Sequence, residues 1–399
     1  MTILYLVCKI PINWKEVKMR FIPHILLVLA LGCATTSQVK EQEPPEGRVS
    51  EARRCLSTGF EYLKNGMYDE AIIYFKKAIE DSTTYLEAYI NLADAYDKKG
   101  EFGEEELVYK KLIEVLPDNI AGYIGLGRLY VDLGRFDESI AQYEKALEIE
   151  PDNPDAHYGL GYAYEVSGNL NKAIEYYEKA VSLTPEDASM RYRLATVYIT
   201  VGERDKGIAE LEKLLKKHPE DIDVRRDLGN AYLASEQYAK ADTQFQYIIE
   251  RIPNDKTTLW KLGQTYEGLK RYDDAIQKYK EAIAVDTTDI VPYLYLSDLY
   301  IRLGKFNDAE NLLNKASKLS TDKSIIVLCL LGDAYTGKGD KLYSAKAYKE
   351  AITQYEKAID SYTKATKMND PKWSIYAEKG LDRAKIKLKK AKEEAWWEK

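Results

Sequence analysis

The amino-acid sequence predicts an all-α protein in which pairs of antiparallel helices stack one after another as a solenoid. The main observation is an internal repeat, in which a small residue is followed three positions later by tyrosine and the pair recurs every 34 residues. Repeats of about 20 to 50 residues are typical of stacked arrays. A second observation is a turn glycine within most repeats, and a third is a proline that closes five of them. The eight small–tyrosine pairs are Gly59/Tyr62, Ala93/Tyr96, Gly127/Tyr130, Gly161/Tyr164, Ala195/Tyr198, Gly229/Tyr232, Gly263/Tyr266 and Ser297/Tyr300.

The first segment, residues 1–32, has the pattern of a signal peptide. Three basic residues precede an apolar run over 21–32, which is shorter than the roughly 20 apolar residues that a transmembrane helix needs. The run ends in Ala30-Leu31-Gly32-Cys33, which resembles the lipobox of bacterial lipoproteins. The resemblance implies that Cys33 carries a lipid and begins the mature chain, with Met19 as an alternative translation start. An uncleaved apolar helix with a free thiol is the other interpretation.

The residues around Cys33 also predict a location. Several acyl chains on one cysteine would anchor the chain stably, so we expect a membrane contact through Cys33. Ala34 stands where many inner-membrane lipoproteins have aspartate, and the resemblance therefore implies an outer-membrane lipoprotein facing the periplasm, with the inner membrane less favoured. Residues 33–51 are polar and contain Pro44-Pro45, which predicts a flexible tether.

Residues 52–324 are predicted to form eight units of 34 residues, each with two helices. Apolar residues three, four and seven positions apart give each helix one apolar stripe, and small residues let the two helices approach closely. Glycine between the helices supplies a positive φ, and proline stops the second helix. These features resemble the tetratricopeptide repeat over about residues 52–368, which implies a right-handed superhelical solenoid stabilised by stacking. The turn glycines are Gly100, Gly134, Gly168, Gly202 and Gly304, and the prolines are Pro117, Pro151, Pro185, Pro219 and Pro253.

Residues 325–370 predict a ninth unit with a lengthened second helix. Small and aromatic residues recur every seven positions from Ser344 to Ala365, which adds about four turns to that helix. Asp370-Pro371 ends it, and residues 371–399 predict a capping helix with Lys and Glu on its outer face. Its Trp396-Trp397 pair either packs on the long helix or offers an exposed contact. The sequence therefore predicts about nine repeats plus a cap.

Composition and charge limit the classes of function that we expect for the chain. The chain has 399 residues and a net charge of −7, and its acidity is spread along the sequence. Nucleic-acid binding needs a basic stripe, so we expect no nucleic-acid partner. Four cysteines without a CxxC pair predict neither a disulfide framework nor a metal site. We expect no cofactor, no small-molecule substrate and no catalytic residues, and hence a protein that is not an enzyme.

Three features that could suggest chemistry are better interpreted as structural. His157 occupies a packing position of a first helix. The glycines at 125, 127, 159 and 161 lie within helices with no strand before them, so close helix packing is favoured over a phosphate loop. The three glutamates at 104–106 are expected to form a solvated helix face.

The resemblance to the tetratricopeptide repeat also implies a partner site. In that family a peptide or protein segment binds a concave groove lined by the first helix of each repeat, and Tyr, Trp and Arg are frequent at interface hot spots. Packing between repeats is the alternative role of the tyrosines. The pattern argues against a carboxylate clamp, because Lys261 replaces the expected asparagine. The predicted groove residues are Arg128, Tyr158, Tyr162, Tyr192, Arg226, Asn230, Trp260, Gln264 and Asp298.

The predicted function is a non-enzymatic interaction scaffold or assembly chaperone of the cell envelope. One specific version is an assembly lipoprotein of a type IV pilus or secretion system, and another is a cell-wall or outer-membrane assembly adaptor. A different class is a substrate-recruiting subunit of an envelope enzyme complex, which would need a catalytic domain on another chain.

Overall fold

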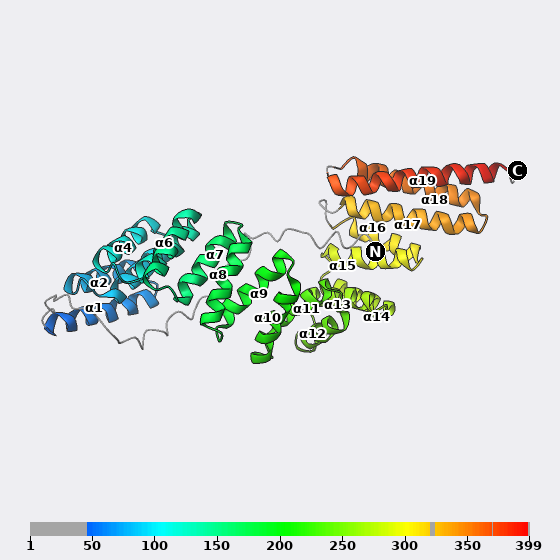
Figure 1. The fold of residues 1–399 in the computed structure, drawn as a ribbon. Helices are drawn as coiled ribbons and strands as arrows, with labels where there is room; N and C mark the ends of the chain where they lie inside the picture. Colours follow the sequence, from blue (N-terminus) through cyan, green and yellow to red (C-terminus); the bar gives the residue numbers. More distant parts are fainter. Residues whose placement is uncertain (1–45, 320–323, 369, 398–399) are drawn as a thin grey trace. The chain divides into compact units, whose positions relative to one another are not determined.

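The computed structural model describes residues 46–319, 324–368 and 370–397, and all regular structure in these residues is α-helical (Figure 1). The predicted all-α fold class is therefore confirmed. The predicted signal peptide, Cys33 and most of the predicted tether lie outside the described residues. The chain divides into two compact units, one up to Val201 and one from Gly202.

In the described part of the first unit each helix contacts the next one along the chain. The helices are α1 (Glu46–Lys64), α2 (Tyr68–Asp81), α3 (Leu86–Lys99), α4 (Phe102–Val115), α5 (Ala121–Asp132), α6 (Phe136–Ile149), α7 (Pro154–Val166), α8 (Leu170–Leu183) and α9 (Ala188–Val201). The odd-numbered helices are the first helices of the sequence repeats, and the even-numbered ones are the second helices.

The described helices of the second unit continue this order, and each again contacts the next. They are α10 (Arg204–Lys217), α11 (Ile222–Ala234), α12 (Tyr238–Arg251), α13 (Lys256–Gly268), α14 (Tyr272–Val285), α15 (Ile290–Arg302), α16 (Phe306–Ala316), α17 (Ser324–Ser344), α18 (Tyr348–Thr366) and α19 (Pro371–Trp397).

The turn between the two helices of a repeat needs a left-handed residue. Six glycines supply it, with φ between 71° and 94°. Glu236 and Lys270 occupy the same repeat position with φ of 59° and 61°, a conformation that L-residues other than glycine rarely adopt. The turn conformation is therefore imposed by the packed helices on either side, even where no glycine is present. The six glycines are Gly66, Gly100, Gly134, Gly168, Gly202 and Gly304.

Two tyrosines of the second helices show why this residue suits the repeat core. Tyr177 and Tyr279 are fully buried between helices, where their rings fill the space left by Gly161 and Gly263 of the facing helices. Their hydroxyl groups donate hydrogen bonds to Glu165 (2.7 Å) and Glu267 (2.5 Å), twelve residues earlier. Phenylalanine would fill the same space but could not donate this bond, so tyrosine both packs the core and fixes a carboxylate at its edge.

The second helix of the ninth repeat, α18, is longer than the second helices of the other repeats, as predicted, but it begins at Tyr348 and gains fewer than the four predicted turns. Both helices of this repeat are long: α17 spans 21 residues and α18 spans 19, and the chain turns between them at residues 345–347, where Lys346 has φ of 60°. Gly339 lies inside α17, where a Cβ would be 2.6 Å from the ring of Tyr355, so the position requires glycine. This glycine serves close packing and does not end a helix.

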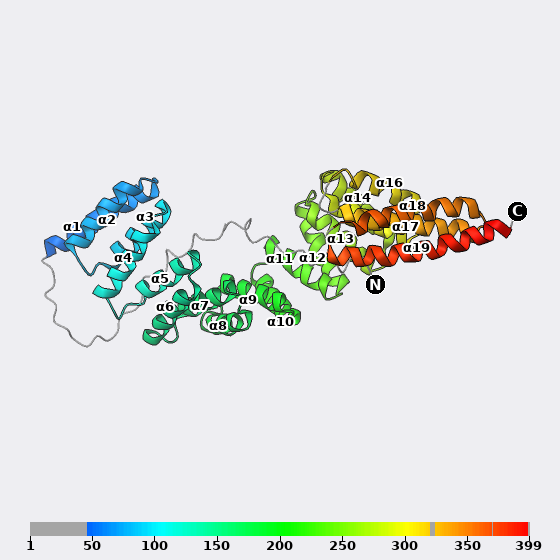
Figure 2. The same ribbon diagram turned by 90° about the horizontal axis from the view of Figure 1, so that it is seen from above.

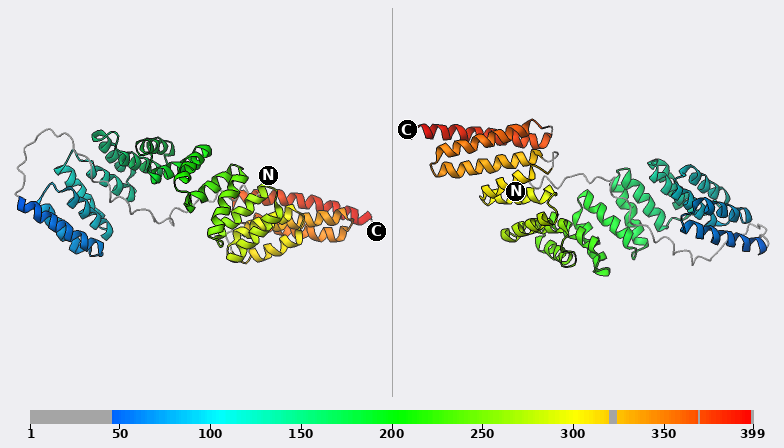
Figure 3. Two further views of the ribbon diagram at one scale, coloured as in Figure 1. Left: turned by 90° about the horizontal axis from the view of Figure 1, so that it is seen from below. Right: turned by 180° about the vertical axis from the view of Figure 1, so that it is seen from behind.

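The last helix, α19, runs beside α17 and α18, and the three form an antiparallel bundle (Figures 2 and 3). Its buried side consists of one large and four small residues, Trp373, Ala377, Gly380, Ala384 and Ala391, which allow close approach to the other two helices. Trp396 and Trp397 are 66% and 77% exposed, so the interpretation that they pack on the long helix is wrong. They remain available for a contact with another molecule.

Candidate functional site

The predicted groove residues are distributed over both units, four on α5, α7 and α9 and five on α11, α13 and α15. Within each unit they recur at the same repeat positions of successive first helices, and α5 contacts α7 as α11 contacts α13. Their side chains are therefore carried on neighbouring helices of one layer. In each unit, this set of helix faces forms a first-helix surface.

In the first unit, aromatic rings and an arginine of the first-helix surface pack against each other. The ring of Tyr158 is 5.4 Å from that of the buried Tyr177, and the guanidinium of Arg193 lies 5.0 Å above the centre of the Tyr162 ring. Arg193 Nη1 is also 3.5 Å from a Glu165 carboxylate oxygen. Tyr158, Tyr162 and Tyr192 are all half-buried. These tyrosines thus contribute to packing between repeats while keeping part of each side chain accessible.

Arg128 is the most exposed of the four predicted residues in this unit. Its guanidinium donates a hydrogen bond to the hydroxyl of Tyr109 (3.3 Å) and lies 3.8 Å from a carboxylate oxygen of Glu105. Glu105 is only 1% exposed, so the prediction that residues 104–106 form a solvated face is wrong for this glutamate. Burial raises the pKa of its carboxyl to about 7. The cause is that Glu105 takes a repeat position where other units have small residues.

In the second unit, Trp260 supplies the largest aromatic surface. Its indole stacks on the ring of Tyr295 at 5.4 Å and 14°, and Tyr295 stacks on Tyr279 at 5.9 Å. The ammonium group of Lys261 lies 4.4 Å from the centre of the indole. Trp260 is half-buried, so this row of rings holds one face of the indole in place while the side chain stays partly accessible.

Arg226 is tied to the next repeat. Its guanidinium donates to a carboxylate oxygen of Asp255 at 2.6 Å and to the Thr258 hydroxyl at 3.1 Å. Asp255 is the N-cap of α13, and its carboxylate accepts a hydrogen bond from the backbone N–H of Thr258. The positive charge of Arg226 is therefore paired within the chain.

Two amide side chains have unused hydrogen-bonding capacity. Asn230 on α11 and Gln264 on α13 occupy the same position of consecutive repeats, and both are half-buried. Within the described residues, Asn230 Oδ1 and Gln264 Oε1 are buried acceptors without a hydrogen-bond partner. Such groups are rare in folded proteins, because each one forfeits the bonds it made to water in the unfolded chain. A ligand that hydrogen-bonds these amides would remove that cost.

Asp298 does not present an exposed carboxylate, in contrast to its predicted place in the groove. It is 6% exposed and accepts a hydrogen bond from Arg302 Nε at 2.9 Å. Arg302 also pairs with Glu267, which accepts the Tyr279 hydroxyl. Burial raises the pKa of both carboxyls, and the nearby Arg302 opposes the rise. Glu267 and Arg302 were missed among the predicted residues, although they occupy the twelfth and thirteenth repeat positions that line the groove in the resembled family.

His157 and the glycines within the first helices lie in packed positions. His157 is buried, and its Nε2 is 2.8 Å from the carbonyl oxygen of Pro151, as expected for a packing residue. A Cβ at Gly125 would be 2.2 Å from the Tyr109 ring, and one at Gly159 would be 2.3 Å from the Tyr143 ring. Close helix packing therefore explains these glycines. In the part of the chain that the structure describes, no group of three His, Cys, Asp or Glu side chains could hold a metal ion.

Comparison with known proteins agrees with the helix-pair architecture. Tetratricopeptide-repeat family models match residues 52–80, 86–119, 154–187, 192–255, 226–290 and 268–324, and a further repeat model of this type matches 127–165. Together they cover more than half of the chain. The chain belongs to the tetratricopeptide repeat family. Repeats of this family generally serve as non-catalytic scaffolds that bind peptides or proteins.

Several solved tetratricopeptide repeat structures are similar to this chain. A protein from Parabacteroides merdae is 20% identical, with 66% of this chain and 98% of that one covered and a TM-score of 0.49. YrrB, described as having an unusual peptide-binding site, is 23% identical, with 46% and 95% covered and a TM-score of 0.43. Pseudomonas aeruginosa PilF is 17% identical, with 52% and 95% covered and a TM-score of 0.45. A comparison with curated protein sequences found no match.

The predicted lipid anchor concerns a different part of the chain. Cys33 lies outside the described residues, so its modification stays a prediction from the sequence. Among the helices that the structure does describe, none has the length and apolar character to cross a bilayer.

Proposed function

We propose that this tetratricopeptide repeat protein is a non-enzymatic scaffold or assembly chaperone, held in the cell envelope by a lipid on Cys33. Its ligand is a peptide or an extended protein segment bound on the first-helix surface. The observation that carries the proposal is the combination of Trp260 with the amides of Asn230 and Gln264 on adjacent first helices of the second unit.

The chemistry of this surface suits a polypeptide backbone. An amide side chain can both accept a backbone N–H and donate to a backbone carbonyl, and two amides one repeat apart can contact successive stretches of a chain. The half-buried indole of Trp260 offers an apolar surface for a ligand side chain, and tryptophan is enriched among residues that dominate binding energy. The surface thus provides both backbone recognition and an apolar contact.

The double variant Asn230→Ala/Gln264→Ala tests this proposal. Since neither buried oxygen is hydrogen-bonded to any described residue, their removal should not lower stability, whereas capture of envelope partners should fall about tenfold or more for two lost hydrogen bonds. Partners would be captured by cross-linking in isolated membranes and quantified by mass spectrometry, with thermal unfolding measured in parallel.

The matched control is Gln277→Ala/Asn314→Ala, which removes the same two residue types from exposed positions on the second helices α14 and α16. Equal capture by wild type, test and control variants would refute ligand binding by the two amides. A lower melting temperature of the test variant would show that the amides are structural.

Support for the lipid anchor comes from the sequence: a basic segment, a short apolar run and the Leu31-Gly32-Cys33 site, followed by a polar tether. Metabolic labelling with a palmitate analogue should mark the wild type and not Cys33→Ala. Equal labelling of the two would rule out this anchor. Fractionation of the labelled protein between inner and outer membranes would then test the proposed outer-membrane location.

The partner would belong to an envelope assembly. An assembly lipoprotein of a type IV pilus or secretion system has the same organisation of lipidated cysteine, tether and repeats, and it is our more specific version of the proposal. The identities of the cross-linked partners distinguish this version from a cell-wall adaptor and from a substrate-recruiting subunit of an envelope enzyme. Each version predicts that a different class of protein is captured.

A further inference from the structure

The outer side of α19 carries a line of exposed apolar residues. Ile375, Ile386 and Trp397 are 55%, 59% and 77% exposed and follow each other at intervals of eleven residues. Eleven residues make about three helical turns, so the three side chains lie on one side of the helix over a length of about 33 Å. The buried residues of α19, such as Ala377 and Ala384, lie on the side that packs in the bundle. The apolar line therefore faces solvent.

Basic residues accompany this line. Residues 385–392 read KIKLKKAK, and α19 as a whole has eight basic and four acidic side chains in a chain whose net charge is −7. Lys387 and Lys392 reach back to the bundle, where they pair with Asp340 and Glu356. Lys385, Lys389 and Lys390 are exposed on the outer side. A cationic surface is thus concentrated on one helix of an acidic protein.

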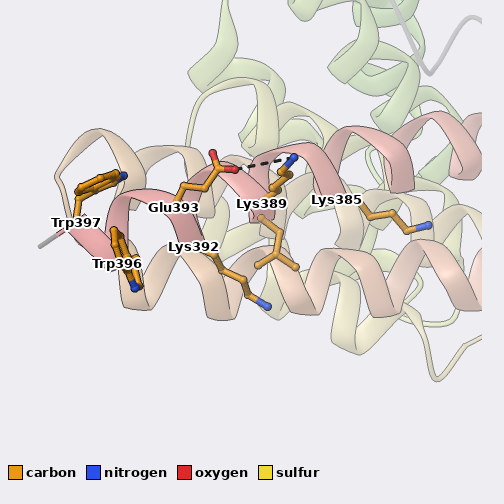
Figure 4. A pocket seen from close by; sticks show the side chains of 7 residues that line it. Lys385, Lys389, Lys392, Glu393, Trp396 and Trp397 are labelled. Carbon is orange, nitrogen blue, oxygen red and sulfur yellow. Dashed lines mark ion pairs between the residues drawn. The ribbon is translucent and has the colours of Figure 1, made fainter. Parts of the chain in front are cut away.

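A pair of tryptophans follows the lysines. The rings of Trp396 and Trp397 meet edge to face, with centroids 4.7 Å apart, and both are exposed. With neighbouring lysines they line an open hollow of about 710 Å³, shown in Figure 4. Within the hollow, Lys389 lies 4.0 Å from Glu393, and the other lysine side chains extend along the helix.

We propose that this outer face of α19 binds the surface of an anionic phospholipid bilayer. Exposed lysines attract acidic headgroups, and their long aliphatic stems let the ammonium groups stay in the headgroup layer while the helix lies close to it. Tryptophan prefers the boundary between headgroups and acyl chains, because its ring is apolar and its N–H is polar. The face is defined by Ile375, Lys379, Lys385, Ile386, Lys389, Lys390, Trp396 and Trp397, and the exposed acidic residues Glu378, Asp382 and Glu393 lie on the same side of the helix.

The arrangement favours a bilayer over an acidic protein. Residues that dominate protein interfaces cluster near the centre of a contact in a well-packed pocket. Here the apolar residues are single, spread along about 33 Å, and the two tryptophans stand at one end. A planar surface can contact all of them together. The inference goes beyond the lipid anchor, since it requires no modification of Cys33 and would align the C-terminal bundle with the membrane.

Vesicle flotation with the full chain carrying Cys33→Ala tests this inference without the proposed anchor. Vesicles of phosphatidylcholine with phosphatidylglycerol should bind the protein more tightly than vesicles of phosphatidylcholine alone, and salt should weaken the binding. The variant Lys385→Gln/Lys389→Gln/Lys390→Gln should bind about 100-fold more weakly, at roughly fivefold for each lysine. Residues 1–32 are common to all variants, so binding through them cancels in the comparison.

The control Lys64→Gln/Lys145→Gln/Lys280→Gln removes the same charge from exposed positions on other helices and should bind within about twofold of the parent. Quenching of tryptophan fluorescence by brominated acyl chains should fall in Trp396→Ser/Trp397→Ser, whose helicity is checked by circular dichroism, and any quenching of Trp14 is common to both proteins. Equal binding of the test and control lysine variants, or equal binding to neutral vesicles, would overturn the inference. Absence of anionic-vesicle binding alongside capture of an acidic protein would assign the face to that protein instead. Palmitate labelling of Cys33 is a separate measurement, so failure of one proposal leaves the other standing.

Discussion

Replacing Glu105 with glutamine is expected to stabilise the first unit at high pH and to change its stability little at low pH. Glu105 takes the repeat position held by small residues in other units, as by Ala71 and Ala173. Its Oε2 has no hydrogen-bond partner among the described residues, and Arg128 lies 3.8 Å from its Oε1. The charged carboxylate is therefore poorly compensated, which is why burial raises its pKa to about 7.

The sign and size of the effect follow from this shift. Below the ordinary pKa of 4.5, Glu105 is protonated in both the folded and the unfolded chain and costs no stability. Between pH 4.5 and about 7 the unfolded chain loses the proton first, so stability falls as pH rises, and above 7 the cost is constant. At about 1.4 kcal/mol per pKa unit the full cost is about 3 kcal/mol, and we expect about 2–3 kcal/mol because the exposed Arg128 can move closer to the charge.

Hydrogen exchange of the α4 amides measures this cost locally, which matters because repeat arrays open in units. After correction for intrinsic rates, Glu105→Gln should protect α4 about 30- to 150-fold more than wild type at pH 8.5 and less than about twofold more at pH 4.5. The control Glu104→Gln alters the exposed neighbour and should change protection at neither pH. A gain that is the same at both pH values, or no gain, would refute the assignment of a poorly compensated buried charge.

Two further predictions concern the repeat packing. Gly263→Ala should lower the free energy of unfolding by about 1–3 kcal/mol, since its Cβ would be 2.5 Å from the ring of the buried Tyr279, and an unchanged melting temperature would contradict this close contact. Lys270→Gly should instead raise stability by about 0.5–1 kcal/mol, because a positive φ costs lysine more than the added chain entropy costs glycine. Thermal unfolding checks the second prediction against Lys280→Gly, which places glycine inside α14 and should destabilise by about 1 kcal/mol.

Much of the fold could be predicted because the repeat encodes it locally. Each unit places a small residue on its first helix opposite an aromatic residue on its second, as at Gly161 and Tyr177, where a Cβ on the glycine would be 2.8 Å from the ring. Such contacts join residues close in sequence, so a 34-residue period is enough to predict helix pairs that contact their neighbours. The same reasoning correctly assigned the helical glycines to packing.

The candidate site was less predictable, because residue type and repeat position do not determine which part of a side chain stays accessible. Asp298 is at a predicted groove position, yet its carboxylate is buried against Arg302. Arg226 is likewise paired with Asp255 of the following repeat. In contrast, the lack of a hydrogen-bond partner for the side-chain oxygens of Asn230 and Gln264 within the described residues depends on the positions of all neighbouring donors, which only the structure gives.

The sequence alone therefore determined the period, the helical class and the residue types on each helix face, since these depend on local propensity and on contacts that recur from repeat to repeat. Only the tertiary structure decided that Glu105 is buried, that the ninth repeat turns at Lys346, and that Trp396 and Trp397 face solvent. Each of these departs from the repeat pattern. The conformation and burial at each of these positions depend on the sizes and charges of particular neighbouring side chains, which the 34-residue period does not specify.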